Sequence, residues 1–146
     1  RNFMGYTANK TQLMIGLGMS SISDSWYGFA QNVKTVKEYE KFVNEGEIPV
    51  FRGHILSEED LIIRKHILNI MCHFSTSWKD ESLEIENIED HILKLQEMID
   101  DGLVIVDGDS LSVLEEARPY VRNICMAFDK KLHQKQPETK LFSMTI

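Results

Sequence analysis

The sequence predicts an α+β protein that is mostly helical. From residue 35 onward, apolar residues recur at spacings of three and four, which is typical of helices with one buried face. An Asp-Gly-Asp string at 107–109, between two apolar runs, predicts a β-hairpin. Residues 1–30 differ, because they hold four of the eight glycines and only three charged residues. We therefore expect two domains, covering residues 1–33 and 34–146.

The first domain is predicted to contain one buried strand. Leu13, Met14 and Ile15 are apolar, and the string Gly16-Leu17-Gly18 lets another backbone or a ligand approach closely. A lone Gly-x-Gly without a helical pattern behind it is a weak signal for phosphate binding. The other interpretation, a tight strand with small residues for packing, is favoured.

Residues 35–56 are expected to form a short helix and then an extended segment. Thr35 can cap the helix, and Gly46 and Pro49 end it. The apolar face of this helix consists of Val36, Tyr39, Phe42 and Val43. The apolar string at 50–56 then indicates a short strand or an extended arm.

Two longer helices are expected next. Ser57 is suited to begin the first, because Asp60 stands three residues further on, and the apolar pattern continues to about His73. The second covers residues 84–101, and Gly102 is placed to end it as the residue after the C-cap. Its apolar residues recur every three or four positions and are Ile85, Ile88, Ile92, Leu95 and Ile99.

The remaining chain is expected to form the hairpin and a last helix. The hairpin strands are predicted at 103–106 and 110–114, and the helix tolerates Pro119 only in its first turn. The predicted buried face of this helix is Val121, Ile124, Cys125, Phe128 and Leu132. The tail from Gln134 is polar until Leu141 and is expected to be loosely held.

Helix, helix, two-stranded wing and helix is the order of a winged-helix domain, in which the second helix often reads DNA in the major groove. Here the second helix carries seven carboxylates against Lys94 alone, and these would repel phosphates. The carboxylates are those of Glu84, Glu86, Glu89, Asp90, Glu97, Asp100 and Asp101. We therefore expect no nucleic-acid partner, while a stand-alone winged-helix interaction module without enzymatic activity stays an alternative function.

Composition favours a cytoplasmic protein with its own core and no membrane partner. The chain has 146 residues, 42% of them hydrophobic, and 16 basic against 23 acidic residues give a net charge of −7. The longest nearly apolar stretch, 13–19, is far shorter than the roughly 18 residues that span a bilayer. No signal-peptide pattern is present at the N-terminus. Cys72 and Cys125 are predicted to be two reduced, buried thiols.

The sequence contains no recognisable catalytic or metal-binding motif. Cys72 and His73 are neighbours on a helix and point about 100° apart, and His66 and His73 are two turns apart. The five histidines are therefore expected to be structural, and neither a nucleophile motif nor a phosphate-binding loop occurs. The arginines in apolar settings could each bind an acidic ligand or a structural carboxylate, and structural pairing is favoured. These arginines are Arg52, Arg64 and Arg122.

Several strings share their order with one known family. The first group is 2–7, 16–23, Tyr27 and 30–32, and the second is Arg52-Gly53, Arg64, Cys72 and Phe74. The last group is 122–126, Phe128-Asp129, Phe142-Ser143 and Ile146. Together they resemble the oxygen-independent coproporphyrinogen III oxidases, of the radical S-adenosylmethionine class, over the whole chain without a large gap.

The resemblance implies that the chain is a C-terminal fragment. In this family, a partial (β/α) barrel holds a C-x-x-x-C-x-x-C motif that binds a [4Fe–4S] cluster, and this chain has no such motif. The cluster cleaves S-adenosylmethionine, and the radical removes hydrogen from the propionates of coproporphyrinogen III, giving protoporphyrinogen IX in haem biosynthesis. Residues 1–33 would supply the last strand of the truncated barrel, and residues 34–146 a winged-helix-like domain that covers the active site.

The resemblance also assigns two site residues. Ile22, in the Ser-x-Ile-Ser string, is expected to contact S-adenosylmethionine, and Phe3 is expected on the substrate side. Met4 departs from the family, since many members have Gln there, which puts a polar contact at this position in doubt. The missing barrel of the same chain and the substrate are the expected partners. The segment alone is expected to be inactive and to bind neither cofactor.

Overall fold

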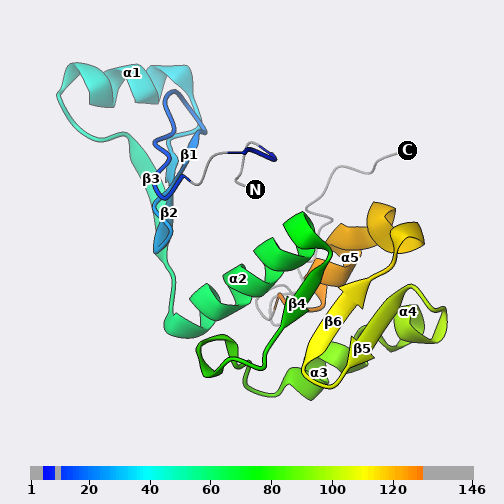
Figure 1. Ribbon diagram of the computed structural model, residues 1–146. Helices are drawn as coiled ribbons and strands as arrows, with labels where there is room; N and C mark the ends of the chain where they lie inside the picture. Colours follow the sequence, from blue (N-terminus) through cyan, green and yellow to red (C-terminus); the bar gives the residue numbers. More distant parts are fainter. Residues whose placement is uncertain (1–4, 9–10, 130–146) are drawn as a thin grey trace. The chain divides into compact units, whose positions relative to one another are not determined.

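The computed structural model describes residues 5–8 and 11–129. It divides the chain into two compact units, Arg1–Leu61 and Ile62–Ile146, which Figure 1 shows with their helices and strands labelled. Helices account for 41% of the structure and strands for 22%, which confirms a mixed fold in which helix predominates. The domain boundary predicted between residues 33 and 34 stays a prediction.

The first unit is built around a three-stranded antiparallel sheet. Its strands are β1 (Ile22–Asp24), β2 (Gly28–Asn32) and β3 (Val50–Ile55), in the order β1-β2-β3. Strands β2 and β3 are joined through α1 (Val36–Asn44). The extended segment predicted at 50–56 is therefore confirmed as a strand.

The buried strand predicted at 13–15 is wrong. Leu13, Ile15 and Leu17 are 59%, 69% and 81% exposed, and Met14 pairs with Asp24 through a single isolated bridge. The chain cannot continue as a strand because Gly18 has φ +92°, outside the extended region. The close approach expected of the glycines does occur, since a Cβ on Gly16 would lie 2.8 Å from the carbonyl oxygen of Ile22.

Helix α1 begins where it was predicted but does not bury its apolar face. The Thr35 hydroxyl oxygen accepts the N–H of Glu38 at 3.3 Å, which satisfies one of the free donors of the first turn. No residue of α1 is buried, and Val36 and Val43 are 55% and 51% exposed. Tyr39 and Phe42 on the same face are half-buried, so the described part of the first unit covers this face only in part.

The second unit combines helices with another three-stranded antiparallel sheet. After α2 (Glu58–His73) come β4 (Ser75–Ser77), the 3₁₀ turn η1 (Glu81–Leu83), α3 (Ile88–Leu93), α4 (Gln96–Asp100), β5 (Val104–Asp107), β6 (Ser110–Val113), the 3₁₀ helix η2 (Glu115–Tyr120) and α5 (Val121–Met126). The sheet order is β4-β6-β5. The predicted hairpin is confirmed as β5 and β6, with Gly108 in the turn at φ +53°, whereas β4 was missed by the sequence reasoning.

The start of α2 is a reciprocal pair of hydrogen bonds. The Ser57 hydroxyl accepts the N–H of Asp60 at 3.1 Å, and the Asp60 carboxylate accepts the N–H of Ser57 at 3.0 Å. This confirms the predicted start, and the helix ends at His73 as expected.

The single helix predicted over 84–101 is wrong, because two short helices occupy this stretch. Asn87 has φ +57°, so α3 begins only at Ile88. The Leu95 N–H bonds to the carbonyl of Ile92, three residues back, and this tight turn buries the Leu95 side chain to 1% exposure. Gly102 ends α4 as predicted, with φ +68°. The N–H of Gly102 bonds to the carbonyl of Ile99, and that of Leu103 to the carbonyl of Met98.

The predicted last helix is likewise divided. Pro119 lies inside η2 rather than in the first turn of α5. Four residues of the predicted face are buried, namely Val121, Ile124, Cys125 and Phe128. They join one core with Ile70, Leu95, Val104 and Leu111. Leu132 and the tail from Gln134 lie outside the described residues.

Candidate functional site

The candidate site is one face of the sheet in the first unit. Side chains of successive residues in a strand point to opposite faces, while directly paired residues on neighbouring strands share a face. Ile22 pairs with Gln31, and Gln31 pairs with Arg52, so these three residues form a row across β1, β2 and β3. The row places Ile22, the residue expected to contact S-adenosylmethionine, on the same face as a cation.

Hydrogen bonds fix the orientation of Gln31 and Arg52 within this row. The Gln31 side-chain nitrogen donates to the carbonyl of Ser20 at 3.2 Å, so its oxygen is free to face β3. That oxygen accepts a hydrogen bond from Arg52 Nε at 2.9 Å. Arg52 is therefore held by a neutral amide, although the sequence favoured a carboxylate as its partner.

A second row on the same face contains Asp24, Phe29 and His54. Asp24 is buried and its carboxylate accepts the N–H of Trp26 at 3.0 Å, which stabilises the turn between β1 and β2. His54 lies 3.5 Å from the carboxylate of Asp60 at the start of α2. Arg52 differs from His54 because no carboxylate lies within ion-pair distance of it among the described residues.

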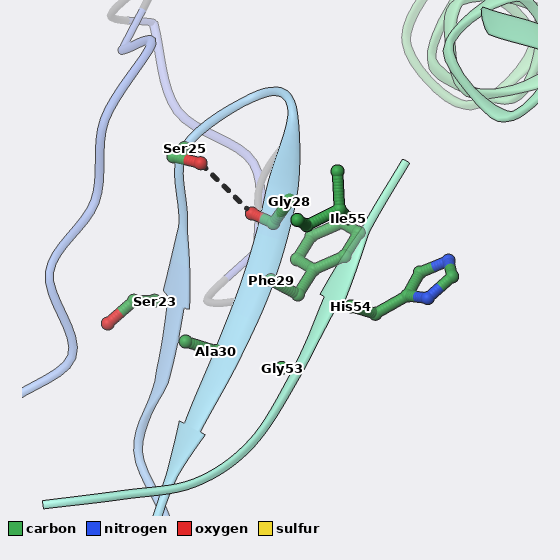
Figure 2. A pocket seen from close by; sticks show the side chains of 8 residues that line it. All are labelled: Ser23, Ser25, Gly28, Phe29, Ala30, Gly53, His54 and Ile55. Carbon is green, nitrogen blue, oxygen red and sulfur yellow. Dashed lines mark hydrogen bonds between the residues drawn. The ribbon is translucent and has the colours of Figure 1, made fainter. Parts of the chain in front are cut away.

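Two hollows lie against this sheet. One, of about 280 Å³, is lined by Ile22, Phe29, Ala30, Gln31, Arg52, Gly53 and His54. The other, of about 440 Å³, is lined by Ser23, Ser25, Gly28, Phe29, Ala30, Gly53, His54 and Ile55, and Figure 2 shows these residues on the three strands and, for Ser25, just after β1. The lining of the second hollow is made largely of small residues, whereas the first hollow combines Ala30 and Gly53 with larger side chains.

The loop at 16–18 supports the edge of the sheet. The buried Asn32 side chain donates to the carbonyls of Gly16 and Gly18 at 3.1 and 2.9 Å. The Gly16 N–H donates to the Ser23 hydroxyl at 3.1 Å, and the Gly18 N–H to the Tyr39 hydroxyl at 3.0 Å. The amides of both glycines are therefore used within the protein, which argues against the phosphate interpretation of Gly-x-Gly.

The second unit contains a buried histidine pair around Phe128. The His66 and His91 rings stack on the Phe128 ring with centroid distances of 6.3 and 5.4 Å. His66 Nε2 donates to the carbonyl of Leu83 at 2.8 Å, so Nδ1 accepts from the Thr76 hydroxyl at 2.7 Å. His91 Nδ1 donates to the carbonyl of Ala127 at 2.8 Å. These contacts agree with the structural role predicted for the histidines.

Burial of His66 lowers the pKa of its imidazole below 6.5. The hydrogen bond to the Leu83 carbonyl opposes this pKa shift, while the nearby His91 and Lys65 reinforce it. The imidazole is therefore held in its neutral form in the folded unit.

The other residues singled out in the sequence do not form a site. Arg64 is half-buried on α2, and Arg122 is exposed on α5. Both cysteines are free thiols, Cys125 buried and Cys72 half-buried. Within the described part of the chain, no three His, Cys, Asp or Glu side chains are grouped so that they could hold a metal ion. Phe3 and Met4 lie outside the described residues.

Sequence reasoning could not find the Gln31–Arg52 pair, although it noted Arg52 as an unusual charge. The two residues lie 21 positions apart, and only the strand register brings them together.

No helix in the described residues is both long enough and apolar enough to span a membrane.

Comparisons with known proteins identify the relatives of this chain. It is 36% identical over 140 residues to the oxygen-independent coproporphyrinogen III oxidase of Escherichia coli (strain K12), covering 92% of this chain and 31% of that protein. The enzyme of the same name from Synechocystis is 33% identical, covering all of this chain and 33% of the relative. No family model matches the chain.

A solved structure shows the same fold. The E. coli coproporphyrinogen III oxidase, a radical SAM enzyme, matches with a TM-score of 0.83 and 33% identity over 90% of this chain and 32% of that one. The chain thus spans about a third of the length of its relatives. It is a segment homologous to the oxygen-independent coproporphyrinogen III oxidases, which confirms the family that its sequence resembles.

Proposed function

We propose that this chain is the C-terminal segment of an oxygen-independent coproporphyrinogen III oxidase of the cytoplasm. The complete enzyme would convert coproporphyrinogen III to protoporphyrinogen IX by oxidative decarboxylation in haem biosynthesis. The observation that carries this proposal is the identity of 36% over 92% of the chain, together with the structural match. The segment contributes binding surface and is inactive without the remaining two thirds.

In this proposal, the sheet of the first unit completes the catalytic barrel, and Ile22 contacts S-adenosylmethionine. The fit is favourable, because Ile22 is half-buried beside a hollow that also contains an apolar ring, Phe29. Bound S-adenosylmethionine would supply the radical chemistry that characterises the family. Phe3 is proposed on the substrate side by resemblance alone.

The [4Fe–4S] cluster does not fit the residues of this chain. A cluster of this kind is usually held by Cys thiolates, and the chain has only two cysteines. The Cys125 thiol donates toward the carbonyl of Ile67 at 3.8 Å inside the core. We therefore assign the cluster to the barrel that this chain lacks.

The second unit would form the winged-helix-like domain that covers the substrate site. Its order α2, β4, α3, α4, β5, β6 and α5, with the sheet order β4-β6-β5, supports this architecture. All seven carboxylates predicted over 84–101 are exposed, so the face that reads DNA in other winged helices is acidic here. This favours a part of an enzyme over a stand-alone nucleic-acid module.

A hybrid enzyme tests the proposal. The homologous segment of the E. coli oxidase is replaced by this chain, and formation of protoporphyrinogen IX is followed under anaerobic conditions. We expect turnover by the hybrid and none by the E. coli enzyme truncated before the segment. The variant Ile22→Ala should raise the KM for S-adenosylmethionine in the hybrid. A hybrid that is folded and carries its cluster, yet forms no product, would contradict the proposal.

A further inference from the structure

We infer that Arg52 is a carboxylate-binding residue of this site, and that Gln31 positions it. The inference rests on the proposed function, because it concerns a ligand that contacts the face carrying Ile22. The chemistry that it assigns is a carboxylate, which a guanidinium binds through two parallel N–H bonds. Two ligands of the proposed enzyme carry one, namely S-adenosylmethionine and the porphyrinogen.

The first support is the unused binding capacity of Arg52. Its Nε is bonded to Gln31 Oε1, which is neutral, so the positive charge is not neutralised there. Its terminal nitrogens can still donate four N–H bonds. Since no carboxylate of the described residues lies within ion-pair distance, an anionic ligand would be the charge partner.

The second support is the restriction placed on the side chain. An unrestrained arginine loses much rotamer freedom when it binds a ligand. Here the Gln31 amide is held by the Ser20 carbonyl at 3.2 Å and holds Arg52 Nε at 2.9 Å in turn. The guanidinium plane is thus oriented before a ligand arrives, which reduces the entropic cost of binding.

The third support is the spacing along the row. Ile22 and Arg52 lie on the two outer strands, so their backbones are two strand spacings apart, about 10 Å. Both residues line the hollow of about 280 Å³. A ligand that packs an apolar part on Ile22 can therefore place a carboxylate on Arg52 without leaving this face.

The test is a binding titration of the hybrid enzyme described above, in which this chain is joined to the rest of the E. coli oxidase, with two probes. Coproporphyrin III, the oxidised form of the substrate with the same carboxylates, is followed by its fluorescence, and S-adenosylmethionine by calorimetry. We expect Arg52→Gln to weaken binding of one probe roughly tenfold or more, since a charge-assisted bidentate contact is lost. The probe that is affected identifies which ligand supplies the carboxylate.

Two further variants separate this role from general charge and from folding. Lys34→Gln removes the same charge from a residue of the first unit that does not line the 280 Å³ hollow, since the Lys34 ammonium lies 5.3 Å from the ring of Phe51 instead. It should change affinity less than about twofold. Gln31→Ala keeps the charge but frees Arg52, and it should weaken binding several-fold. Circular dichroism verifies that each variant is folded.

Three outcomes would overturn the inference: neither probe binds the folded hybrid, Arg52→Gln binds both probes as the unmodified hybrid does, or Lys34→Gln loses as much affinity as Arg52→Gln. An unchanged Gln31→Ala would overturn the positioning role. These results are distinct from failure of the proposed function, because the hybrid enzyme is judged by its turnover. An active hybrid with unchanged Arg52→Gln binding would refute only this inference.

Discussion

Lowering the pH should destabilise the second unit through His66. The His66 side chain is fully buried, and both ring nitrogens are engaged, with the Thr76 hydroxyl and the Leu83 carbonyl. Burial lowers the pKa of this imidazole below the ordinary value of 6.5, which applies when the chain is unfolded. As the pH falls through 6.5, the unfolded chain therefore binds a proton that the folded unit does not.

The sign and size follow from proton linkage. The contribution of neutral His66 to the stability of the folded unit is complete above the imidazole pKa of the unfolded chain. It decreases as the pH falls below that pKa, because the unfolded state then binds more protons than the folded state. Each pH unit between the folded and unfolded pKa values changes the free energy of unfolding by at most about 1.4 kcal/mol. Between pH 7.5 and 5.5, His66 should lower the free energy of unfolding by up to about 1.4 kcal/mol.

Urea unfolding followed by Trp fluorescence measures this effect. Trp78 is half-buried and packs against the core of the second unit, so its emission reports on that unit. The variant Trp26→Phe removes the other tryptophan, which belongs to the first unit. The free energy of unfolding is then obtained at several pH values at constant salt.

A comparison of two histidine variants isolates His66. His66→Gln should be less stable at pH 7.5, by about 1–3 kcal/mol, because it removes a buried hydrogen-bonding ring. It should also have a shallower dependence on pH than the parent. His73→Gln, which alters an exposed histidine on the same helix, should keep the parental dependence. The reasoning is refuted if His66→Gln and its parent lose equal free energy between pH 7.5 and 5.5.

Three further predictions concern the fold. Leu111→Ala should cost about 2–5 kcal/mol of unfolding free energy, because the side chain is fully buried on β6, whereas Ile105→Ala, at 48% exposure on β5, should cost less than about 1 kcal/mol in the same urea assay. Gly102→Ala should lower the free energy of unfolding by about 1–2 kcal/mol because of the φ of +68° alone, since no atom lies within 4 Å of the added Cβ to clash with it. Gly102→Asn should lower it less, because Asn tolerates this backbone conformation better. Ser57→Ala should cost about 1 kcal/mol by removing the cap of α2, measured as a lower urea midpoint, and no loss would show that the cap is not stabilising.

Local signals in the sequence predicted the elements whose ends are set by neighbouring residues. Thr35, Ser57, Gly102 and Gly108 each act within a few positions, through a cap or a positive φ, and each does so in the structure. The four described residues of the last predicted apolar face are buried for the same reason, since the helical period alone places them together.

Predictions failed where tertiary packing overrides the local pattern. The spacing of the apolar residues from Ile85 to Ile99 is compatible with one long helix and with two short helices. Burial of the Leu95 side chain favours the tight turn that separates the two short helices. Strand β4 has only three residues, Ser75–Ser77, and depends on pairing with β6. The apolar residues at 13–15 predicted burial, but they are exposed in the structure.

The contrast between the two units bears on how the site is completed. The second unit has a core of thirteen buried residues of its own. In the described part of the first unit, Val33 is the one buried apolar side chain. Large apolar side chains are exposed instead, among them Phe51 and Ile55 on β3, at 56% and 86%. A three-stranded sheet needs an apolar face packed against another layer for independent stability. The sheet that carries Ile22, Gln31 and Arg52 therefore has the surface expected of an element that packs within a larger body, as the proposed barrel would provide.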